Sequence, residues 1–374
     1  MSQNDSRKPR VLLLFGGRSS EHPVSCVTAA GVLEAIDRDK YEVVPVGITR
    51  EGTWTLVEQD VTGWSLTAGS KPEISASEEV LRLTGEPGSH ELLASGSSHE
   101  VRSLGDIDLV FPLLHGPFGE DGSLQGMLEM VDVPYVGSGI AASAIGMDKH
   151  FMKVVFEAAG FEVGPYAVIT DKQWERDRSA ALESLSGLEY PLFVKPARAG
   201  SSVGISKVDS PETLEAAIEA ARIHDPKVVV EQGITGREIE CGVLEGRGHF
   251  APRASMPGEI VVEDHGHTFY DFDAKYVDGA AVQLSCPAVL SDEATAEIRN
   301  LAARAFDAVN AEGLSRVDFF YTDEGKWIIN EINTMPGFTP SSMYPQMWAQ
   351  TGIGYADLID ELIYLGLNRK TGLR

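Results

Sequence analysis

The stretch SRVDFFYTDEGKWIINEINTMPG, residues 315–337, is the most informative part of this chain. Two apolar segments flank the turn sequence DEG, which predicts a β-hairpin. If the two strands pair symmetrically about this turn, Asp318 lies opposite Glu331 and Arg316 lies opposite Asn333. Because side chains alternate along a strand with a period of two, these four polar residues are expected to share one face.

Two carboxylates and an amide oxygen on one face are hard ligands of the kind that Mg²⁺ takes together with phosphate oxygens. The alternative interpretation is a solvated ladder of cross-strand salt bridges. The apolar sequence WII precedes Glu331, and TMPG follows Asn333. The polar residues therefore end a strand, where irregular backbone can offer free N–H groups, and this placement favours a metal site.

The composition of the chain limits the possible functions. Its 374 residues, 43% of them hydrophobic and 23% charged, predict a folded protein of two or three domains. The formal net charge of −25 repels phosphate backbones and anionic lipids, so nucleic acid and membrane partners are not expected. Three widely spaced cysteines, together with a polar start, predict a cytoplasmic protein.

Outward from the hairpin, the sequence predicts a multidomain α/β and α+β fold. The strand VLLLF, a Gly-rich turn, a helix and the strand YEVVPVGIT form a βαβ opening, which is typical of a parallel sheet. A long helix over 140–159 is expected to lead into the next unit. The predicted units are a parallel α/β domain at 1–140 with a surface insertion, read as a hairpin, at about 62–104, a central unit at 141–235, and a mainly antiparallel C-terminal unit at 236–374.

A second informative segment is KPARAGSSVGISKV. Lys195 lies in an apolar strand, where an ammonium group is costly to bury unless it meets an anion. In the following turn Gly200 and Gly204 allow close backbone approach, and Ser201 and Ser202 supply hydroxyl groups, which is the chemistry of a phosphate cradle. An ordinary hairpin with a snorkelling lysine explains the same residues, so both interpretations stay open.

Other motifs are less specific. GSGIAA, at 137–142, matches a dinucleotide fingerprint, but the acidic ribose ligand that should end a second strand would lie inside a helix. His265 and His267 have a spacing that can serve a metal, although a polar loop is the favoured interpretation. Lys275 and Tyr276 follow on the same segment, where they could close over a phosphorylated substrate.

Together these residues resemble the D-alanine:D-alanine ligases of the ATP-grasp superfamily, over nearly the whole chain. The resemblance rests on seven ordered motifs, namely FGGRSSEHPVS, LLHGPFGEDGSLQG, PYVGSG followed by MDK, KPARAGSSVGISKV, FYDFDAKY, SRVDFF and NEINTMPGFTPSS. It implies an ATP-grasp fold with an N-terminal Rossmann-like domain. It also implies ATP-dependent condensation of two D-alanines through an acyl phosphate, for peptidoglycan precursor synthesis.

The resemblance also implies how ATP and metal are held. Two Mg²⁺ ions, for which Mn²⁺ can substitute, are expected on Asp318, Glu331 and Asn333. The lysines that match the family's phosphate contacts are Lys149, Lys195 and the loop residue Lys275. The residues that match its adenine hinge and its ribose-binding acid are Glu231, Gln232, Ile234 and Glu238.

For the amino-acid substrates, the resemblance assigns Glu21 to the ammonium of the first D-alanine. Glu21, Ser201 and Tyr276 are expected to form the hydrogen-bonded set that latches a closed loop. Arg316 and the N–H of Gly337 match the oxyanion site. The residues that match contacts to the second D-alanine are Ser342, Met343 and, at lower weight, His115.

Tyr276 favours D-alanine over D-lactate or D-serine as second substrate, because ligases for those substrates usually lack this tyrosine. A homodimer is expected from the family. The alternatives left open are another ATP-grasp carboxylate–amine ligase, including the D-alanine–D-lactate and D-alanine–D-serine types, and a dinucleotide-binding protein.

Overall fold

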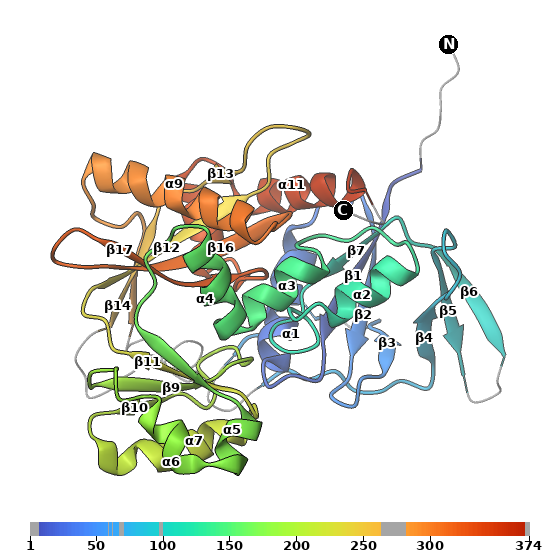
Figure 1. Cartoon of the computed structure of the whole chain (residues 1–374). Coiled ribbons are helices and arrows are strands. Elements are labelled where there is room, and N and C mark those ends of the chain that lie inside the picture. Colours follow the sequence, from blue (N-terminus) through green and yellow to red (C-terminus); the bar gives the residue numbers. More distant parts are fainter. Residues whose placement is uncertain are drawn as a thin grey trace.

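The N-terminal part of the molecule is built on a parallel sheet. The computed structural model describes residues 7–58, 60–61, 63–66, 71–96, 100–262 and 282–370. The first sheet has the order β3-β2-β1-β7 (Figure 1). β1 (Arg10–Gly16) runs parallel to β2 (Glu42–Ile48) and β7 (Leu109–Pro112), and β3 (Trp54–Leu56) is antiparallel to β2. The sequence VLLLF in β1 is fully buried, as expected for a strand covered on both faces.

The long helix predicted over 140–159 is two helices in the structure. α1 (His22–Ala35) follows β1, and α2 (Ser123–Met130) follows β7. The expected helix over 140–159 is broken into α3 (Ile140–Met147) and α4 (Lys149–Ala158). Asp148 between them is extended, and its carboxylate caps α4 by accepting from the N–H groups of His150 and Phe151. The capping side chain explains the break.

The insertion forms a small sheet of its own, with more structure than the hairpin we expected. β4 (Val80–Leu83), β5 (Glu91–Ser95) and β6 (Val101–Asp106) form a three-stranded antiparallel sheet. This sheet lies at the far side of the N-terminal unit from the other two large sheets (Figure 1).

The central part is a four-stranded antiparallel sheet with helices on one side (Figure 1). Its strands follow the order β10-β9-β11-β8. Trp174 is fully buried among the apolar residues of this sheet and its helices. The elements are β8 (Tyr166–Ile169), α5 (Asp171–Arg176), α6 (Arg178–Glu183), β9 (Leu192–Pro196), β10 (Ser206–Val208), η1 (Pro211–Thr213), α7 (Leu214–Arg222) and β11 (Val228–Gln232).

The C-terminal part is an antiparallel sheet with the order β15-β14-β12-β16-β17, and a short β13 pairs with β12. One long helix packs on its outer face, where apolar residues of the helix and of the strands form one core. The elements are β12 (Arg237–Leu244), β13 (Arg253–Ala254), β14 (Gly258–Val262), β15 (Val282–Ser285), α9 (Asp292–Ala308), β16 (Leu314–Tyr321) and β17 (Trp327–Asn333).

The hairpin of β16 and β17 contains a bulge that the sequence reading did not include. Arg316 pairs with Asn333 and Asp318 with Glu331, as expected. Nearer the turn the register differs by one residue, because Tyr321 pairs with Trp327 rather than with Ile328, and the shift follows Asp318.

The bulge changes which face the odd-numbered residues of β17 occupy. Trp327 and Ile329 belong to the core under α9, but beyond the bulge that core contains Ile332. Glu331 and Asn333 line a cavity on the other side. Strict alternation would have put both polar residues in the apolar core.

The two last helices tie the C-terminal sheet to the N-terminal one. α10 (Met343–Gln350) and α11 (Tyr355–Leu367) share one apolar core with residues of β1, α1 and β7. The two ends of the chain therefore build a single support. None of the described helices has the length and apolar character needed to cross a membrane.

Candidate active site

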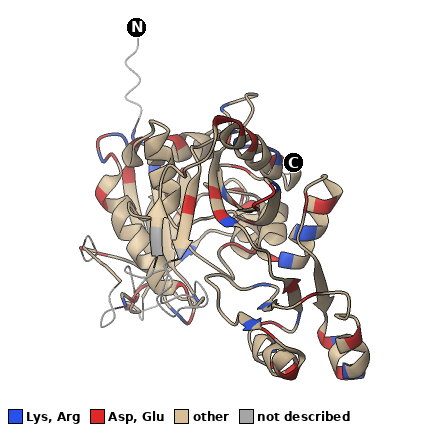
Figure 2. Cartoon of the chain, turned by 90° about the vertical axis from the view of Figure 1, so that its left-hand side faces the viewer, with Lys and Arg blue, Asp and Glu red and all other residues tan. Residues whose placement is uncertain are grey.

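A cavity of about 890 Å³ lies between the N-terminal unit, the central sheet and the C-terminal sheet, since residues of all three line it. Acidic and basic residues are interspersed over the cartoon, and several lie where these parts meet (Figure 2). The predicted site residues that line the cavity are Glu21, His115, Lys149, Lys195, Ser201, Ser202, Glu231, Gln232, Ile234, Glu238, Arg316, Asp318, Glu331, Asn333, Gly337, Ser342 and Met343.

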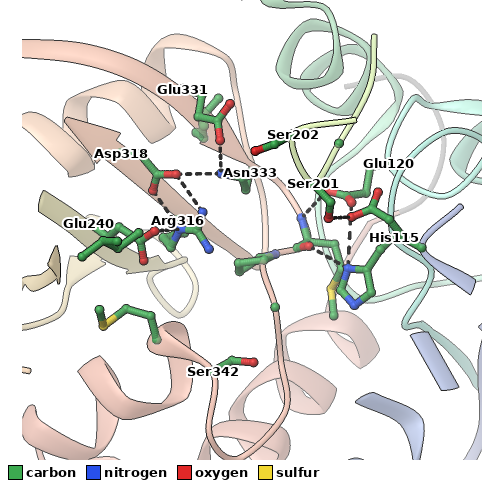
Figure 3. A pocket seen from close by; sticks show the side chains of 18 of the residues that line it. His115, Glu120, Ser201, Ser202, Glu240, Arg316, Asp318, Glu331, Asn333 and Ser342 are labelled. Atoms are coloured by element: carbon green, nitrogen blue, oxygen red, sulfur yellow. Dashed lines mark hydrogen bonds and ion pairs between the residues drawn. The ribbon is translucent and has the colours of Figure 1, made fainter. Parts of the chain in front are cut away.

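The polar residues of the β16–β17 hairpin converge as expected (Figure 3). Asn333 Nδ2 lies 3.1 Å from Asp318 Oδ2 and 3.4 Å from Glu331 Oε1. Arg316 donates to both oxygens of Asp318, at 2.8 and 2.7 Å, and its Nε lies 3.2 Å from Glu240 Oε1. Burial opposes a charge here, but Asp318 and Glu240 raise the pKa of Arg316 well above its usual value.

The donor set of this hairpin fits Mg²⁺. The amide group of Asn333 bridges the two carboxylates, at the position where a cation would relieve their repulsion, and rotating the amide presents its oxygen there. Among the described residues, no group of three or more His, Cys, Asp or Glu could hold a metal by itself. Mg²⁺ needs no such group, because it completes its shell with phosphate oxygens and water.

The turn after β9 is held in an unusual backbone conformation. Ser201 and Ser202 both have positive φ, 48° and 59°, and Gly204 follows at 72°. Left-handed residues other than glycine cost energy and cluster at functional sites. Successive N–H groups in such a turn form a concave anion-binding surface. This geometry supports the phosphate cradle over an ordinary hairpin.

Glu21 lies at the start of α1 and is 5% exposed. Ser201 donates a hydrogen bond to its carboxylate, so two residues of the expected latch are in contact. The backbone is close as well, because a Cβ on Gly116 or Gly200 would lie 2.4 or 2.5 Å from Glu21 Oε2. The third member, Tyr276, lies outside the described residues, as do Lys275, His265 and His267.

The lysines reach the cavity from two elements. Lys195 Nζ lies 2.9 Å from Glu231 Oε2, and Lys153 Nζ lies 3.5 Å from Glu231 Oε1. Burial alone would raise the pKa of Glu231, but the two lysines outweigh it and lower the pKa to about 2. Lys149 donates to the carbonyl of Ala199 at 2.8 Å, which puts it beside the serine turn. The break before α4 makes Lys149 the first residue of that helix.

The expected adenine hinge consists of the last two residues of β11, Glu231 and Gln232, and of Ile234 just after this strand. The Gln232 side-chain oxygen accepts a hydrogen bond from the backbone N–H of Glu189 at 3.0 Å. This bond fixes the Gln232 side chain. A Cβ on Gly164 would lie 2.5 Å from the Ile234 side chain, which therefore packs tightly against Gly164. Glu238 is on β12, two residues before Glu240 and on the same face.

At the other end of the cavity, the N-terminus of α10 provides backbone donors. Ser342 is the N-cap residue of α10, and Met343 is its first residue. The Ser342 hydroxyl accepts from the N–H of Thr339 at 3.1 Å. A helix N-terminus attracts a carboxylate, and Gly337 lies close by, since a Cβ on it would be 3.2 Å from Ser342 Oγ.

His115 is buried and held by two hydrogen bonds. Nδ1 lies 3.2 Å from the carbonyl of Met335, to which it donates, so Nε2 accepts from the Thr28 hydroxyl at 3.2 Å. Burial lowers the pKa of His115 to about 4, so the ring is neutral. Glu120 lies 3.9 Å from Nδ1 and accepts from the N–H of Gly116 at 2.8 Å.

Sequence reasoning missed three cavity or near-cavity residues. Burial, helped by the charge of Glu21, raises the pKa of Glu120 to about 8. Lys153 is one helical turn after Lys149, a spacing that could have signalled it. Glu240 alternates with Glu238 in REIEC, which could have signalled a second inward-facing carboxylate. No sequence signal distinguished Glu120 from other acidic residues in a turn.

The arrangement defines a class of protein. A parallel α/β unit followed by two sheets around one cavity, with lysines on one side and an acidic hairpin on the other, is the arrangement of an ATP-grasp ligase. Solved structures with this fold include two ligases. They are a D-Ala:D-Ser ligase, VanG, from Enterococcus faecalis (TM-score 0.81, 34% identity, 96% of this chain and 99% of that one) and the D-alanine-D-alanine ligase of Coxiella burnetii (0.78, 33%, 97% and 94%).

Sequence comparison is more specific. Residues 10–138 match the family model of the D-ala D-ala ligase N-terminus, and residues 155–364 match that of its C-terminus. A D-alanine--D-alanine ligase of Arthrobacter sp. (strain FB24) is 66% identical over 98% of this chain and 96% of its own length. One of Streptomyces griseus is 52% identical over 100% and 96%. The chain therefore belongs to the D-alanine–D-alanine ligase family, which confirms the resemblance and the fold expected from the sequence.

The raised pKa of Glu120 predicts a pH effect on stability. Between the usual value near 4.5 and about 8, the folded chain holds a proton on Glu120 that the unfolded chain has lost. Stability therefore falls as the pH rises through this window. Glu120→Gln should remove this loss, so its melting temperature relative to the unaltered protein should be higher at about pH 9 than at about pH 5. Thermal unfolding of both ligand-free proteins checks this, and an equal difference at both pH values would contradict it.

Proposed function

We propose that this chain catalyses ATP-dependent condensation of two D-alanines to D-alanyl-D-alanine, for peptidoglycan precursor synthesis in the cytoplasm. One observation carries the proposal. The Glu21–Ser201 pair, suited to an ammonium group, lines the same cavity as the hairpin whose carboxylates suit a metal–phosphate complex. Membership of the ligase family adds support.

In the first step, a carboxylate oxygen of the first D-alanine attacks the γ-phosphorus of ATP. The new P–O bond forms as the bond to the β-phosphate oxygen breaks, giving an acyl phosphate and ADP. Lys149, Lys195 and the serine turn hold the phosphates. Asp318, Glu331 and Asn333 would hold two Mg²⁺ ions, which would neutralise phosphate charge. Glu21 holds the ammonium, which fixes the carboxylate for attack.

In the second step, the amine of the second D-alanine attacks the acyl carbon. The C–N bond forms while the carbonyl electron pair moves to oxygen, where Arg316 and the N–H of Gly337 stabilise the negative charge. Collapse expels inorganic phosphate with its bonding pair. Neutral His115 is a weak proton acceptor, and Glu120 takes the proton from the amine only in its ionised form, which increases as the pH rises toward its pKa of about 8.

Removal of a metal ligand should stop turnover. Glu331→Ala takes away one of the two hairpin carboxylates, and metal stabilisation amounts to several kcal/mol, so we expect kcat to fall by at least about a thousandfold. ADP release in saturating D-alanine and Mg²⁺ measures this. Glu324→Ala, at the exposed turn of the same hairpin, is the control and should keep its rate. Near-normal turnover of Glu331→Ala would remove the hairpin from the site.

Product analysis tests the choice of second substrate. Tyr276 is the sequence feature that favours D-alanine. With ATP, D-alanine and an equal concentration of D-lactate or D-serine near neutral pH, we expect the D-alanyl-D-alanine dipeptide to dominate. Chromatography of the products measures the ratio. Dominant depsipeptide or D-alanyl-D-serine would overturn the preference while leaving the ligase chemistry in place.

We further propose that the protein is a homodimer through the apolar residues of α2 and α3. Met130 is 78%, Ile140 47% and Met127 38% exposed, and the Ile140 side chain lies beside Gly122 at the start of α2. Residues 140–147 carry no charged side chain. Because each copy has a net charge of −25, two copies repel except where they meet through an uncharged face.

Charges on this face should separate the copies. The combined change Met127→Lys and Met130→Lys should halve the mass found by light scattering, because burying the new ammonium groups is costly. Val101→Lys, at a site 62% exposed on β6, is the control and should stay dimeric. A monomeric unaltered protein, or capture of a different partner by this face, would contradict the proposal.

A further inference from the structure

Glu240 and Asp318 form a cross-strand pair of like charges. They lie directly opposite each other on β12 and β16, an arrangement that repels unless a cation lies between. Arg316 provides that cation. Its Nε is shared between Asp318 Oδ1, at 2.8 Å, and Glu240 Oε1, at 3.2 Å. Glu240 is only 3% exposed, so little water screens its interaction with the guanidinium group.

The contacts of Arg316 conflict with the proposed role of Asp318. Arg316 holds both oxygens of Asp318, and Asn333 donates to one of them. A divalent cation on Asp318 needs at least one of these oxygens. Such a cation would compete with Arg316 for Asp318, whereas Glu240 would still hold Arg316 from a different strand (Figure 3).

We propose that Glu240 is a positioning residue that keeps Arg316 directed at the acyl carbonyl while Asp318 serves the metal, an inference that rests on the proposed function. Glu240 acts through Arg316 and does not touch the reacting atoms. Its effect therefore belongs to the second step, in which the amine forms the C–N bond, the carbonyl pair moves to oxygen and phosphate leaves.

A simple structural role does not explain a carboxylate at this position. A buried carboxylate is costly to desolvate, and a neutral side chain in the same strand would avoid that cost. Glu238, on the same face of β12, is assigned to ribose and lies opposite Phe320 rather than Asp318. The two glutamates are therefore expected to affect different steps, which makes one a contrast for the other.

The test uses Glu240→Gln, which keeps the shape and an acceptor oxygen but removes the charge. We expect kcat to fall between about tenfold and a hundredfold, because a hydrogen bond to a charged group is weakened. The KM for ATP should stay within about twofold. Rapid-quench measurement should then show a burst of about one ADP per site, since acyl phosphate formation is unaffected and its attack by the amine has become slow.

Three comparisons make the result specific. Glu240→Asp, which keeps the charge, should recover part of kcat. Glu238→Gln should raise the KM for ATP and show no burst. Glu259 lies on the neighbouring strand β14 and pairs with Arg237, not with Arg316, so Glu259→Gln is the charge control. It should leave the kinetics unchanged, which excludes a general effect of lost negative charge.

Metal binding provides a readout other than activity. Free Mn²⁺ measured by electron paramagnetic resonance in the presence of ADP should give affinities for unaltered protein and Glu240→Gln within about threefold. Asp318→Asn should weaken binding more than about tenfold. Loss of Mn²⁺ affinity in Glu240→Gln would make Glu240 a metal ligand and overturn the inference.

Wild-type kcat in Glu240→Gln, or a loss of the first step itself, would also overturn it. If Glu240→Gln does not fold, Glu240→Asp takes its place. A reduced kcat with a burst of ADP then supports the inference, whereas wild-type kcat or a slowed first step contradicts it. Absence of dipeptide with the unaltered protein would remove the proposed function, and this inference with it. Dipeptide formation without the burst would remove the inference alone.

Discussion

The mutual repulsion of carboxylates on one face of the C-terminal sheet is the constraint on which the site depends. Glu240 and Asp318 face each other across two strands, and Glu331 lies opposite Asp318 on the third. A sheet that gathers these charges in a partly buried cavity is stable only if cations lie among them. Arg316 is a cation that the described part of the chain supplies between them, and the negative charge that remains suits the proposed Mg²⁺.

A second requirement is that the N-terminal and C-terminal parts of the chain keep a fixed position relative to each other across the cavity. Glu21 comes from the start of α1, whereas Gly337 and Ser342 come from the segment that leads into α10. These elements are joined by one apolar core, in which α11 packs with β1, α1 and β7. The proposed contacts to the two amino acids thus share one apolar core, whereas Lys195 and Glu231, among the proposed nucleotide contacts, come from the central sheet.

Much of this could be predicted from the sequence, because the signals were local. The pairing of Asp318 with Glu331 was predicted from a symmetric turn, and it holds because the bulge offsets the one-residue difference in register near the turn. The parallel opening followed from the apolar run before a glycine turn. What escaped prediction depended on contacts between distant segments. The pKa of Glu120 is raised by burial and by the charge of Glu21, which lies far away in sequence. The only sequence signal for the helix break was Asp148 itself, a residue type that often caps helices, within an otherwise continuous helical pattern.

The bulge in β17 has a consequence for how this hairpin can vary. On the turn side of the bulge, the tip of the hairpin, the odd-numbered residues Trp327 and Ile329 point into the core under α9. On the other side, the base of the hairpin, the odd-numbered residues Glu331 and Asn333 line the cavity. An insertion or deletion confined to the tip leaves Glu331 and Asn333 pointing into the cavity. Loss of a single residue at the bulge would instead point the Glu331 carboxylate and the Asn333 amide into the apolar core beneath α9. Relatives of this chain should therefore tolerate longer or shorter turns here far more readily than a one-residue deletion before Glu331.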